Sequence, residues 1–239
     1  MKRIGIVPVS DSSGAGLVTA MLATEAAADG GETGELGRIT AVELGRGNLY
    51  DQLCADRWFR MRQLVSYWNC LHGEGRTERI LNPQWGVNWL LRTPEDREKG
   101  ELDRVKAVKL LYSLPGDVAL IDFSSVGSDV LFELMDDMDQ LVAVVDPLPS
   151  RLLQGYERMY RLKLRKPPVH WVVNRWNEGV DGKEMKKILG AERNWISLPE
   201  LPRELLCQAE YSGCGLAGHP QIRSAMAPGM EQLLRRLHI

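Results

Sequence analysis

The feature that most constrains the fold lies at residues 4–20, where an apolar run, a loop of small residues and a helical segment follow one another directly. The run at about residues 3–9 is rich in isoleucine and valine, which is typical of a strand buried on both faces. The loop holds Gly14 and Gly16, which allow close approach of a ligand. An alanine-rich helix, from about residue 17 to 28, should end before the Asp29-Gly30-Gly31 breaker.

A strand, a loop and a helix in this order stand where a phosphate-binding loop of the form G-x-x-x-x-G-K-[ST] would lie, but the lysine is missing. Leu17 and Val18 occupy the positions of the phosphate-binding lysine and the Mg²⁺-binding hydroxyl. The backbone part survives, because the helix start presents free N–H groups and a positive dipole end. Ser12, Ser13 and Thr19 offer hydroxyls to an anion, although helix capping is the role we expect for Ser13.

Strand and helix patterns alternate along the rest of the chain, which predicts one domain over residues 1–239 with a doubly wound, mostly parallel α/β sheet of seven or eight strands flanked by helices. Thr93 and Pro94 are suited to the N-cap and first position of a helix. Residues 72–84 predict a loop with a short helix. Further strands are expected at 38–44, 85–91, 117–122, 140–146, 169–174 and 195–198, and helices at 51–71, 94–112, 128–138, 149–164, 182–189, 202–211 and 222–237.

Three turns should meet at the carboxyl edge of this sheet, where ligands of open α/β folds bind. They are the loop at 11–16, the turn at 122–127 and the Asn174-Arg175 turn. Asp146 also ends an apolar run, but it precedes a proline and is expected to be a turn and cap residue. The sequence therefore places one ligand site beside the first loop.

The composition excludes several functions. The formal net charge of −2 implies no global attraction to nucleic acid, and the basic clusters at 161–166 and 235–236 are expected to be solvated helix ends. The four cysteines contain no C-x-x-C pair and the four histidines share no metal-ligand spacing, so reduced thiols and no metal site are expected. Without an N-terminal apolar run, the expected location is cytoplasmic.

The motifs together resemble the MinD/ParA group of deviant P-loop ATPases, and the CpaE-type pilus-assembly proteins among them, over nearly the whole chain. The family's K-G-G-x-G-K-[ST]-T loop corresponds to residues 12–19. Its dimer-bridging lysine falls on Ser12, its phosphate lysine on Leu17 and its Mg²⁺ hydroxyl on Val18. The positions that match are Gly14, Gly16 and Thr19.

Later motifs also resemble those of the family. The D-x-P-P-G turn that senses the γ-phosphate is similar to the turn from Asp122 to Gly127, and the family's G-N phrase is similar to Gly47-Asn48. The water-positioning aspartate would fall on Leu44 or, with a slip of one residue, on Glu43. The resemblance assigns nucleotide binding to Ser12, Ser13, Gly14, Ala15, Gly16, Leu17, Val18, Thr19, Asn174, Arg175 and Pro199.

The resemblance implies a regulator that binds ATP or ADP, with Mg²⁺ left open, and that helps to position or assemble a cell-envelope machine such as a pilus. Asp122 would be the catalytic residue if the site is active. A single arginine finger is worth about 10³ to 10⁵ in the rate of phosphoryl transfer, so the loss of two lysines and a hydroxyl implies weak or no hydrolysis. The alternatives are a nucleotide-free interaction scaffold that uses the family's dimer face, and an ATPase completed by a partner's charges.

Partners are expected to be cell-envelope or pilus-assembly proteins, with a constitutive homodimer or a monomer. The final segment, residues 229–239, has Met230, Leu233, Leu234 and Leu237 on one helical stripe. This pattern is shared by a helix that packs on a sheet and by one that lies on a membrane, and packing is expected because the stripe is short. Four tryptophans between residues 50 and 90 suggest a partner surface, although most should lie in the core.

Overall fold

The computed structural model describes residues 1–239 apart from 30–37, 46, 60–64, 72–82, 100–102 and 191–193. Its described residues form an eight-stranded sheet with the order β3-β4-β2-β5-β1-β6-β7-β8. The pairs are parallel except for β3, which is antiparallel to β4 at one edge. The expected α/β fold class is thus confirmed. The strands are β1 (Lys2–Pro8), β2 (Ile39–Glu43), β3 (Pro83–Gln84), β4 (Val87–Leu90), β5 (Val118–Asp122), β6 (Gln140–Val145), β7 (Val169–Trp176) and β8 (Ile196–Pro199).

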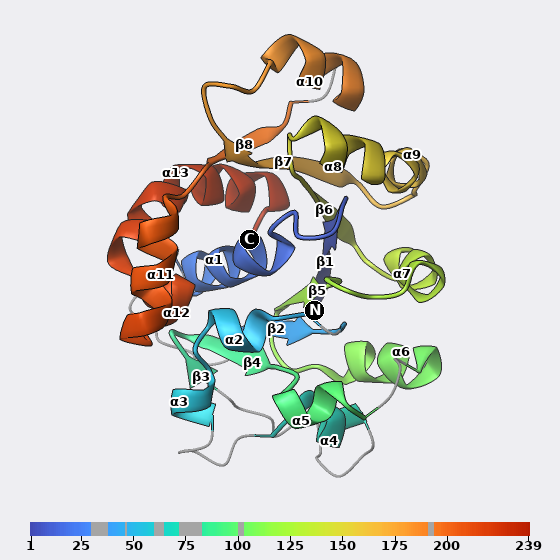
Figure 1. The fold of residues 1–239 in the computed structure, drawn as a ribbon. Coiled ribbons are helices and arrows are strands. Elements are labelled where there is room, and N and C mark those ends of the chain that lie inside the picture. The colour runs from blue at the N-terminus through green and yellow to red at the C-terminus, as the bar shows by residue number, and fades with distance from the viewer. Residues whose placement is uncertain (30–37, 46, 60–64, 72–82, 100–102, 191–193) are drawn as a thin grey trace.

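Helices cover both faces of this sheet (Figure 1). One face carries α1 (Ala15–Asp29), α2 (Leu49–Gln52), α3 (Asp56–Phe59), α11 (Arg203–Ser212), α12 (Gly215–Gly218) and α13 (Pro220–Leu237). The other carries α4 (Tyr67–Leu71), α6 (Arg104–Ser113), α7 (Ser128–Met135), α8 (Pro149–Gln154), α9 (Tyr156–Lys163) and α10 (Gly182–Leu189).

The alternation of side chains along β1 supplies both cores. Ile4 and Ile6 belong to the core beneath α1, whereas Val7 and the following Val9 belong to the core on the opposite face. All four are almost completely buried, as expected for a strand covered on both sides.

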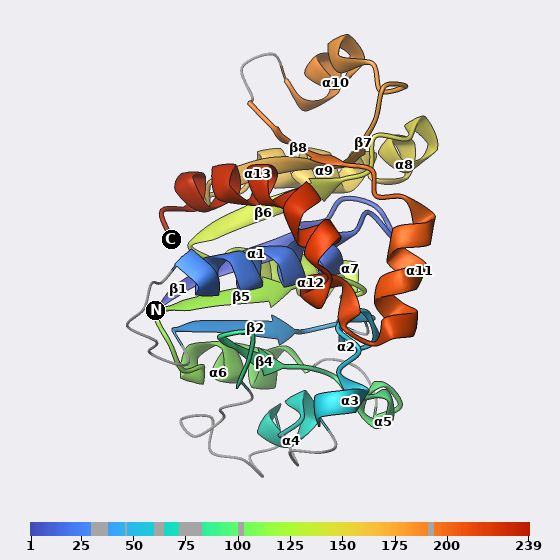
Figure 2. The same cartoon turned by 90° about the vertical axis from the view of Figure 1, so that its left-hand side faces the viewer.

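The loop after β1 lies at the topological switch point of the sheet. β1 pairs with β5 on one side, through Ile4 and Leu120, and with β6 on the other, through Ile4 and Gln140. The strand order therefore runs from β1 in two opposite directions. The carboxyl ends of the strands, where the arrowheads point in Figure 2, meet at the loop after β1, and ligands of open α/β folds bind at such a switch point.

The single helix expected at 51–71 is wrong. The segment instead forms α2, α3 and α4, with residues 60–64 outside the described part. Cys54 has a left-handed φ of 47° and interrupts the helix after Gln52. Leu53 and Trp58 pack in the core beneath α1, but Tyr67 packs in the opposite core. The apolar residues that gave this segment its helical periodicity are therefore buried on two different faces of the sheet.

Two other long helices are also divided. In place of a helix over 94–112, α5 (Pro94–Arg97) precedes α6, and residues 100–102 are outside the description. Thr93 caps α5 as expected, because its side chain accepts a hydrogen bond from the Asp96 N–H. The helix expected at 149–164 is divided at Gly155, where a methyl group would lie 2.5 Å from Cγ1 of Val9. The expected loop at 72–84 lies mostly outside the described residues, and its last two residues form β3.

The tryptophans of this region lie mainly in the interior. Trp58 and Trp89 are buried, and Trp85 contacts both of their rings edge to face at centroid distances of 6.4 and 6.5 Å. Trp85 is half-buried and packs against the same core, and Trp68 is also half-buried, so two of the four tryptophans are fully in the core and a third borders it.

The C-terminal helix α13 packs its apolar stripe on the sheet. The buried stripe residues are Met230, Leu233, Leu234 and Leu237. No helix in the described ranges is long and apolar enough to cross a membrane.

We predict that Leu233→Ala lowers the free energy of unfolding by about 2–5 kcal/mol, because it removes a completely buried side chain. Glu231→Ala, on the exposed face of the same helix, should change stability far less. Deletion of residues 229–239 should destabilise the protein further, and urea unfolding measures all three variants. An unchanged melting temperature after the deletion, together with loss of binding to anionic vesicles, would instead support the membrane interpretation.

Candidate functional site

The loop between β1 and α1 adopts a strained, open turn. Ser12 and Gly14 have left-handed φ values of 59° and 93°, and the Ser13 N–H bonds to the Ser10 carbonyl at 3.3 Å. The Val18 N–H donates to the Gly14 carbonyl at 3.0 Å, which starts the helical ladder. The N–H groups of the residues just before Val18 therefore stand at the helix start, where an anion is stabilised.

A hydrogen bond from Asn174 fixes the position of this loop. Asn174 lies on β7, is 2% exposed, and donates from Nδ2 to the Ser13 carbonyl at 2.9 Å. A methyl group on Gly14 would lie only 2.2 Å from the same nitrogen, so this contact requires glycine. The strand-end asparagine is thus brought to the loop as expected, and in this structure its amide positions the loop.

The hydroxyls of the loop divide into two groups. Thr19 Oγ1 donates to the Ala15 carbonyl at 2.9 Å within α1, so its hydroxyl is already bonded. The Oγ atoms of Ser10 and Ser13 are buried and have no hydrogen-bond partner among the described residues. The expectation that Ser13 caps the helix is therefore wrong. A buried hydroxyl without a partner lowers the stability of the fold by about 1–3 kcal/mol, and a bound ligand or water would remove this cost.

Leu17 and Val18, the two residues expected at the positions of a phosphate lysine and a metal hydroxyl, belong to or pack against the core. Val18 of α1 is fully buried in the core between this helix and the sheet, and Leu17 packs against the same cluster. Their side chains stabilise α1 on the sheet and supply neither a cation nor a metal ligand.

Asp122, at the end of β5, faces the start of α1. Its Oδ1 accepts hydrogen bonds from the Ser124 N–H at 2.9 Å and the Ser124 hydroxyl at 2.6 Å. Its Oδ2 is buried without a partner in the described part of the chain, and a methyl group on Gly16 would lie 3.6 Å from it. Burial raises the pKa of Asp122 to about 6, although the bonds from Ser124 oppose this shift.

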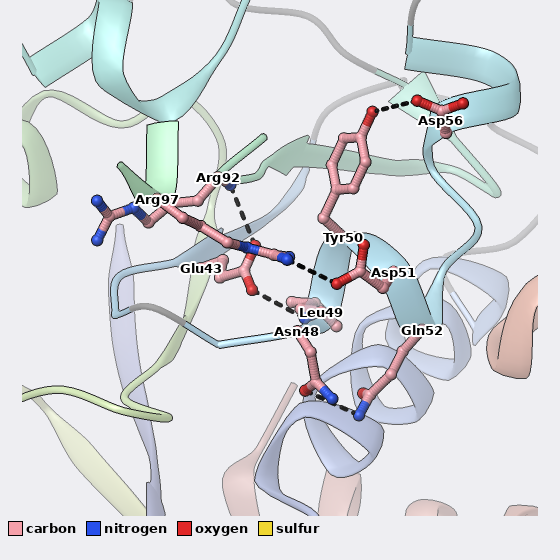
Figure 3. A network of polar contacts seen from close by, with 9 residues as sticks. All are labelled: Glu43, Asn48, Leu49, Tyr50, Asp51, Gln52, Asp56, Arg92 and Arg97. Carbon is pink, nitrogen blue, oxygen red and sulfur yellow. Dashed lines mark hydrogen bonds and ion pairs between the residues drawn. The ribbon is translucent and has the colours of Figure 1, made fainter. Parts of the chain in front are cut away.

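Glu43 stands beside Asp122 at the end of the neighbouring strand β2, and the two residues are register partners. Figure 3 shows its carboxylate between two elements: Oε1 accepts from the Leu49 N–H at 2.8 Å and Oε2 from the Arg92 N–H at 3.1 Å. Burial first, and then the charge of Asp122, raises the pKa of Glu43 to about 8. Of the two positions expected for a water-positioning acid, Leu44 lies in the core, and Glu43 has both oxygens bonded to main-chain groups.

Gln52 covers the start of α1 from the side of α2. Its Nε2 donates to Asn48 Oδ1 at 3.0 Å (Figure 3), and its Oε1 would lie 2.8 Å from a methyl group on Gly16. This Oε1 is buried and has no partner within the described ranges. Next to it, Asp51 pairs with Arg97 of α5 at 2.7 Å. Two unsatisfied oxygen acceptors, from Gln52 and Asp122, therefore face the same glycine.

The remaining expected residues lie farther along the sheet edge. Arg175 has a φ of 59° and forms an ion pair with Asp146 at 2.5 Å. Asp146 also accepts the Leu148 N–H at 3.1 Å, which agrees with the expected turn role. Pro199 is exposed at the end of β8, three strands from β1.

Sequence reasoning missed Ser10, Gln52 and Arg97. The position of Ser10, directly before the loop, could have indicated that it belongs to the site. Gln52 and Arg97 reach the site only through the packing of α2 and α5. Among the described residues, no group of three or more His, Cys, Asp or Glu side chains is arranged to hold a metal ion.

Comparison with protein-family models finds no match to this sequence, and comparison with curated proteins finds none either. Solved structures do match. The septum site-determining protein MinD complexed with Mg-ADP from Pyrococcus horikoshii has 20% identity and a TM-score of 0.72, covering 97% of this chain and 95% of that chain. The cell division ATPase MinD of Pyrococcus furiosus has 21% identity and a TM-score of 0.73, with 98% of each chain covered. A ParA family ATPase from Chlorobium tepidum has 17% identity and a TM-score of 0.70, with 98% of each chain covered. The chain therefore has the MinD/ParA type of P-loop NTPase fold.

We predict that Asp122→Asn makes the protein more stable at neutral pH. The native pKa of about 6 lies above the ordinary 3.8, so the folded state holds the proton longer and wild-type stability falls as pH rises from about 4 to 6. The variant cannot ionise at this position, so its stability should not fall in this way. Its free energy of unfolding at pH 7 should exceed that of wild type by on the order of 3 kcal/mol. Urea unfolding between pH 4 and pH 8 tests this; Glu178→Gln, which removes a carboxyl from an exposed turn, is the matched control and should follow wild type.

Proposed function

We propose that this chain binds an adenine nucleotide, ATP or ADP, at the loop of residues 12–19 and acts as a MinD/ParA-like regulator. The observation that carries the proposal is a glycine-containing loop at a helix start, held by Asn174 and lined by two buried hydroxyls, Ser10 and Ser13, that lack partners among the described residues. The resemblance to the CpaE branch supports a role in positioning or assembling a cell-envelope machine such as a pilus, in the cytoplasm.

The proposed activity is binding with weak or no hydrolysis. Phosphoryl transfer depends on positive charge placed around the phosphates. Here the side chains of Leu17 and Val18 are packed against or within the core, and Ser12 replaces the lysine of the family pattern. The protein would thus be a pseudo-ATPase whose loop and strand ends are retained for recognition.

The residues fit the nucleotide better than they fit its metal. The N–H groups at the start of α1 and the hydroxyls of Ser10 and Ser13 suit phosphate oxygens. Mg²⁺ usually binds through one or two carboxylates together with substrate phosphates, and Asp122 Oδ2 is available for this, with Gln52 Oε1 beside it. Mg²⁺ would neutralise charge that otherwise repels a phosphate from Asp122. The chain's own contribution is to orient the phosphates and to bury Asp122.

A second candidate is an ATPase completed by a partner. It is favoured by one observation: Asp122 Oδ2 and Gln52 Oε1 are two buried acceptors that face Gly16 and lack donors within the described residues. A lysine or arginine from another protein would satisfy them and would restore the missing charge. The third interpretation is an interaction scaffold, in which this site binds no nucleotide.

We predict that isothermal titration detects binding of ATP or ADP, and that phosphate release from the purified protein stays at background. Ser13→Ala should weaken binding several-fold, because it removes a hydroxyl that has no other described partner. Thr24→Val is the matched control, since that buried hydroxyl is bonded within α1 and lies outside the loop. Absence of binding with and without Mg²⁺ would favour the scaffold.

The effect of Asp122→Asn reports the role of the metal. If nucleotide binds with Mg²⁺, the variant should bind more weakly because it loses the carboxylate ligand. If nucleotide binds alone, the variant should bind more tightly because it loses the repulsion. Turnover by wild type that disappears in Asp122→Asn would contradict the pseudo-ATPase proposal.

We further predict that nucleotide does not drive dimerisation, because the family's bridging lysine corresponds to Ser12 here. Light scattering should give the same mass with and without ATP, either that of a monomer or that of a constitutive dimer. Ser12→Lys is an informative variant, as a gain of ATP-dependent dimer would show that the missing charge is the cause. A monomer-to-dimer shift in wild type would overturn this prediction.

A further inference from the structure

A second cavity lies at the opposite edge of the sheet from the loop after β1. It has a volume of about 370 Å³ and is bordered by the end of α9, the start of β7 and the end of α13. Figure 2 shows this edge, where the strands begin and both chain termini lie. The cavity is therefore separated from the nucleotide site by the length of the central strands.

The charged residues that line this cavity are all cationic. Lys163, Arg165 and Lys166 come from the α9 side and Arg236 from α13, with His170 of β7 between them, and the described lining includes neither Asp nor Glu. The fold thus joins two basic segments that are about seventy residues apart in the chain. We call this cavity, with these five residues, the basic pocket.

The charge of the basic pocket is only partly neutralised. Arg165 pairs with Asp136, outside the lining, at 2.8 Å. Arg236 donates to the Asn194 carbonyl at 2.5 Å, and Lys163 donates to the Ile188 carbonyl at 2.7 Å. A carbonyl group carries no net charge, so the bond from Arg236 orients this cation and leaves its charge in place. Such fixed donors with positive charge are the usual means of recognising phosphate oxygens.

His170 lies within this electrostatic field. Burial lowers its pKa, and the positive charges of Arg236, Lys2 and His238 lower it further. Its Nε2 is buried and has no hydrogen-bond partner in the described part of the chain. The pocket therefore combines excess positive charge with an unsatisfied polar atom in its wall.

We propose that the basic pocket binds a phosphate-bearing anion. The volume exceeds that of a single phosphate, so the phosphate group can belong to a soluble phosphorylated compound or to a lipid headgroup at this edge. Both sources share the same recognition: Arg236 and Lys166 contact the oxygens, and His170 gains a counter-charge. The proposal does not depend on the nucleotide site.

The test follows the histidine signals of the full-length protein by NMR during titration with inorganic pyrophosphate. The apparent pKa of His170 should rise by about one unit as the anion offsets the surrounding charges. His219, which precedes the other end of α13, is the internal control and should not respond. Ser13→Ala, in the loop after β1, should leave the His170 response unchanged, which separates this site from the nucleotide site.

Charge-removing variants assign the binding to the pocket. Arg236→Gln and Lys166→Gln should each weaken the pyrophosphate response about tenfold, which corresponds to the loss of one charge-assisted hydrogen bond. Arg235→Gln is the matched control, because that neighbour is outside the pocket and interacts with Glu231 at 3.9 Å. Lys166 is exposed, so its variant should fold even if Arg236→Gln does not.

An experiment with lipid vesicles distinguishes the two sources of phosphate. Sedimentation is measured with vesicles of phosphatidylcholine alone and with equal parts of phosphatidylcholine and phosphatidic acid. Binding to the acidic vesicles that is lost in Lys166→Gln and kept in Arg235→Gln supports a lipid headgroup, whereas a His170 response without sedimentation supports a soluble phosphate compound. The proposal is overturned if neither pyrophosphate nor acidic vesicles act through Lys166 or Arg236, or if the Arg235 control behaves like the pocket variants.

Discussion

The site depends on one buried hydrogen bond, from Asn174 Nδ2 to the Ser13 carbonyl. The bond connects the end of β7 with the loop after β1, across the intervening strand β6. It fixes the loop at the place where the strand order reverses, and it leaves no room for a side chain at Gly14. The start of α1, and with it the position of every N–H group that could meet an anion, follows from this contact.

Around this loop the structure places hydrogen-bond acceptors, whereas a phosphate site of the usual sequence pattern would place cationic hydrogen-bond donors there. Asp122 and Gln52 direct unsatisfied oxygens toward Gly16, and Glu43 adds a second buried carboxyl next to Asp122. Burial first, and then the charge of Asp122, raises the pKa of Glu43 to about 8, so Glu43 retains its proton near neutral pH. A cation brought by a ligand would displace that proton, which makes metal or partner binding at this site dependent on pH.

Much of the fold was predictable from local pattern. The apolar runs ending in Asp122 and Asp146 indicated central strands, and Thr93-Pro94 marked a helix start that the structure confirms. The segment 51–71 was not predictable in this way, because its apolar spacing is divided between two cores on opposite faces of the sheet. Periodicity shows that residues are buried, but it does not show which neighbours bury them.

The site was predictable only in outline. Gly14, Gly16 and Asn174 could be placed from the sequence because they follow or end an apolar run, whereas Gln52 reaches Gly16 only through the packing of α2. The basic pocket shows the same limit. Each of its two basic segments is typical of a solvated helix end in the sequence. Their charges are concentrated only because the fold brings the ends of α9 and α13 to the start of β7.

The central position of β1 also determines when the protein can fold during synthesis. Lys2 pairs with Val118, and Ile4 pairs with Gln140, so β1 leaves the ribosome more than a hundred residues before the two strands that pair with it. Until then, a strand with two apolar faces stays without its neighbours, which is a state prone to aggregation. The loop that follows β1 therefore acquires its shape late, and a nascent chain cannot hold a ligand there before β7 has emerged.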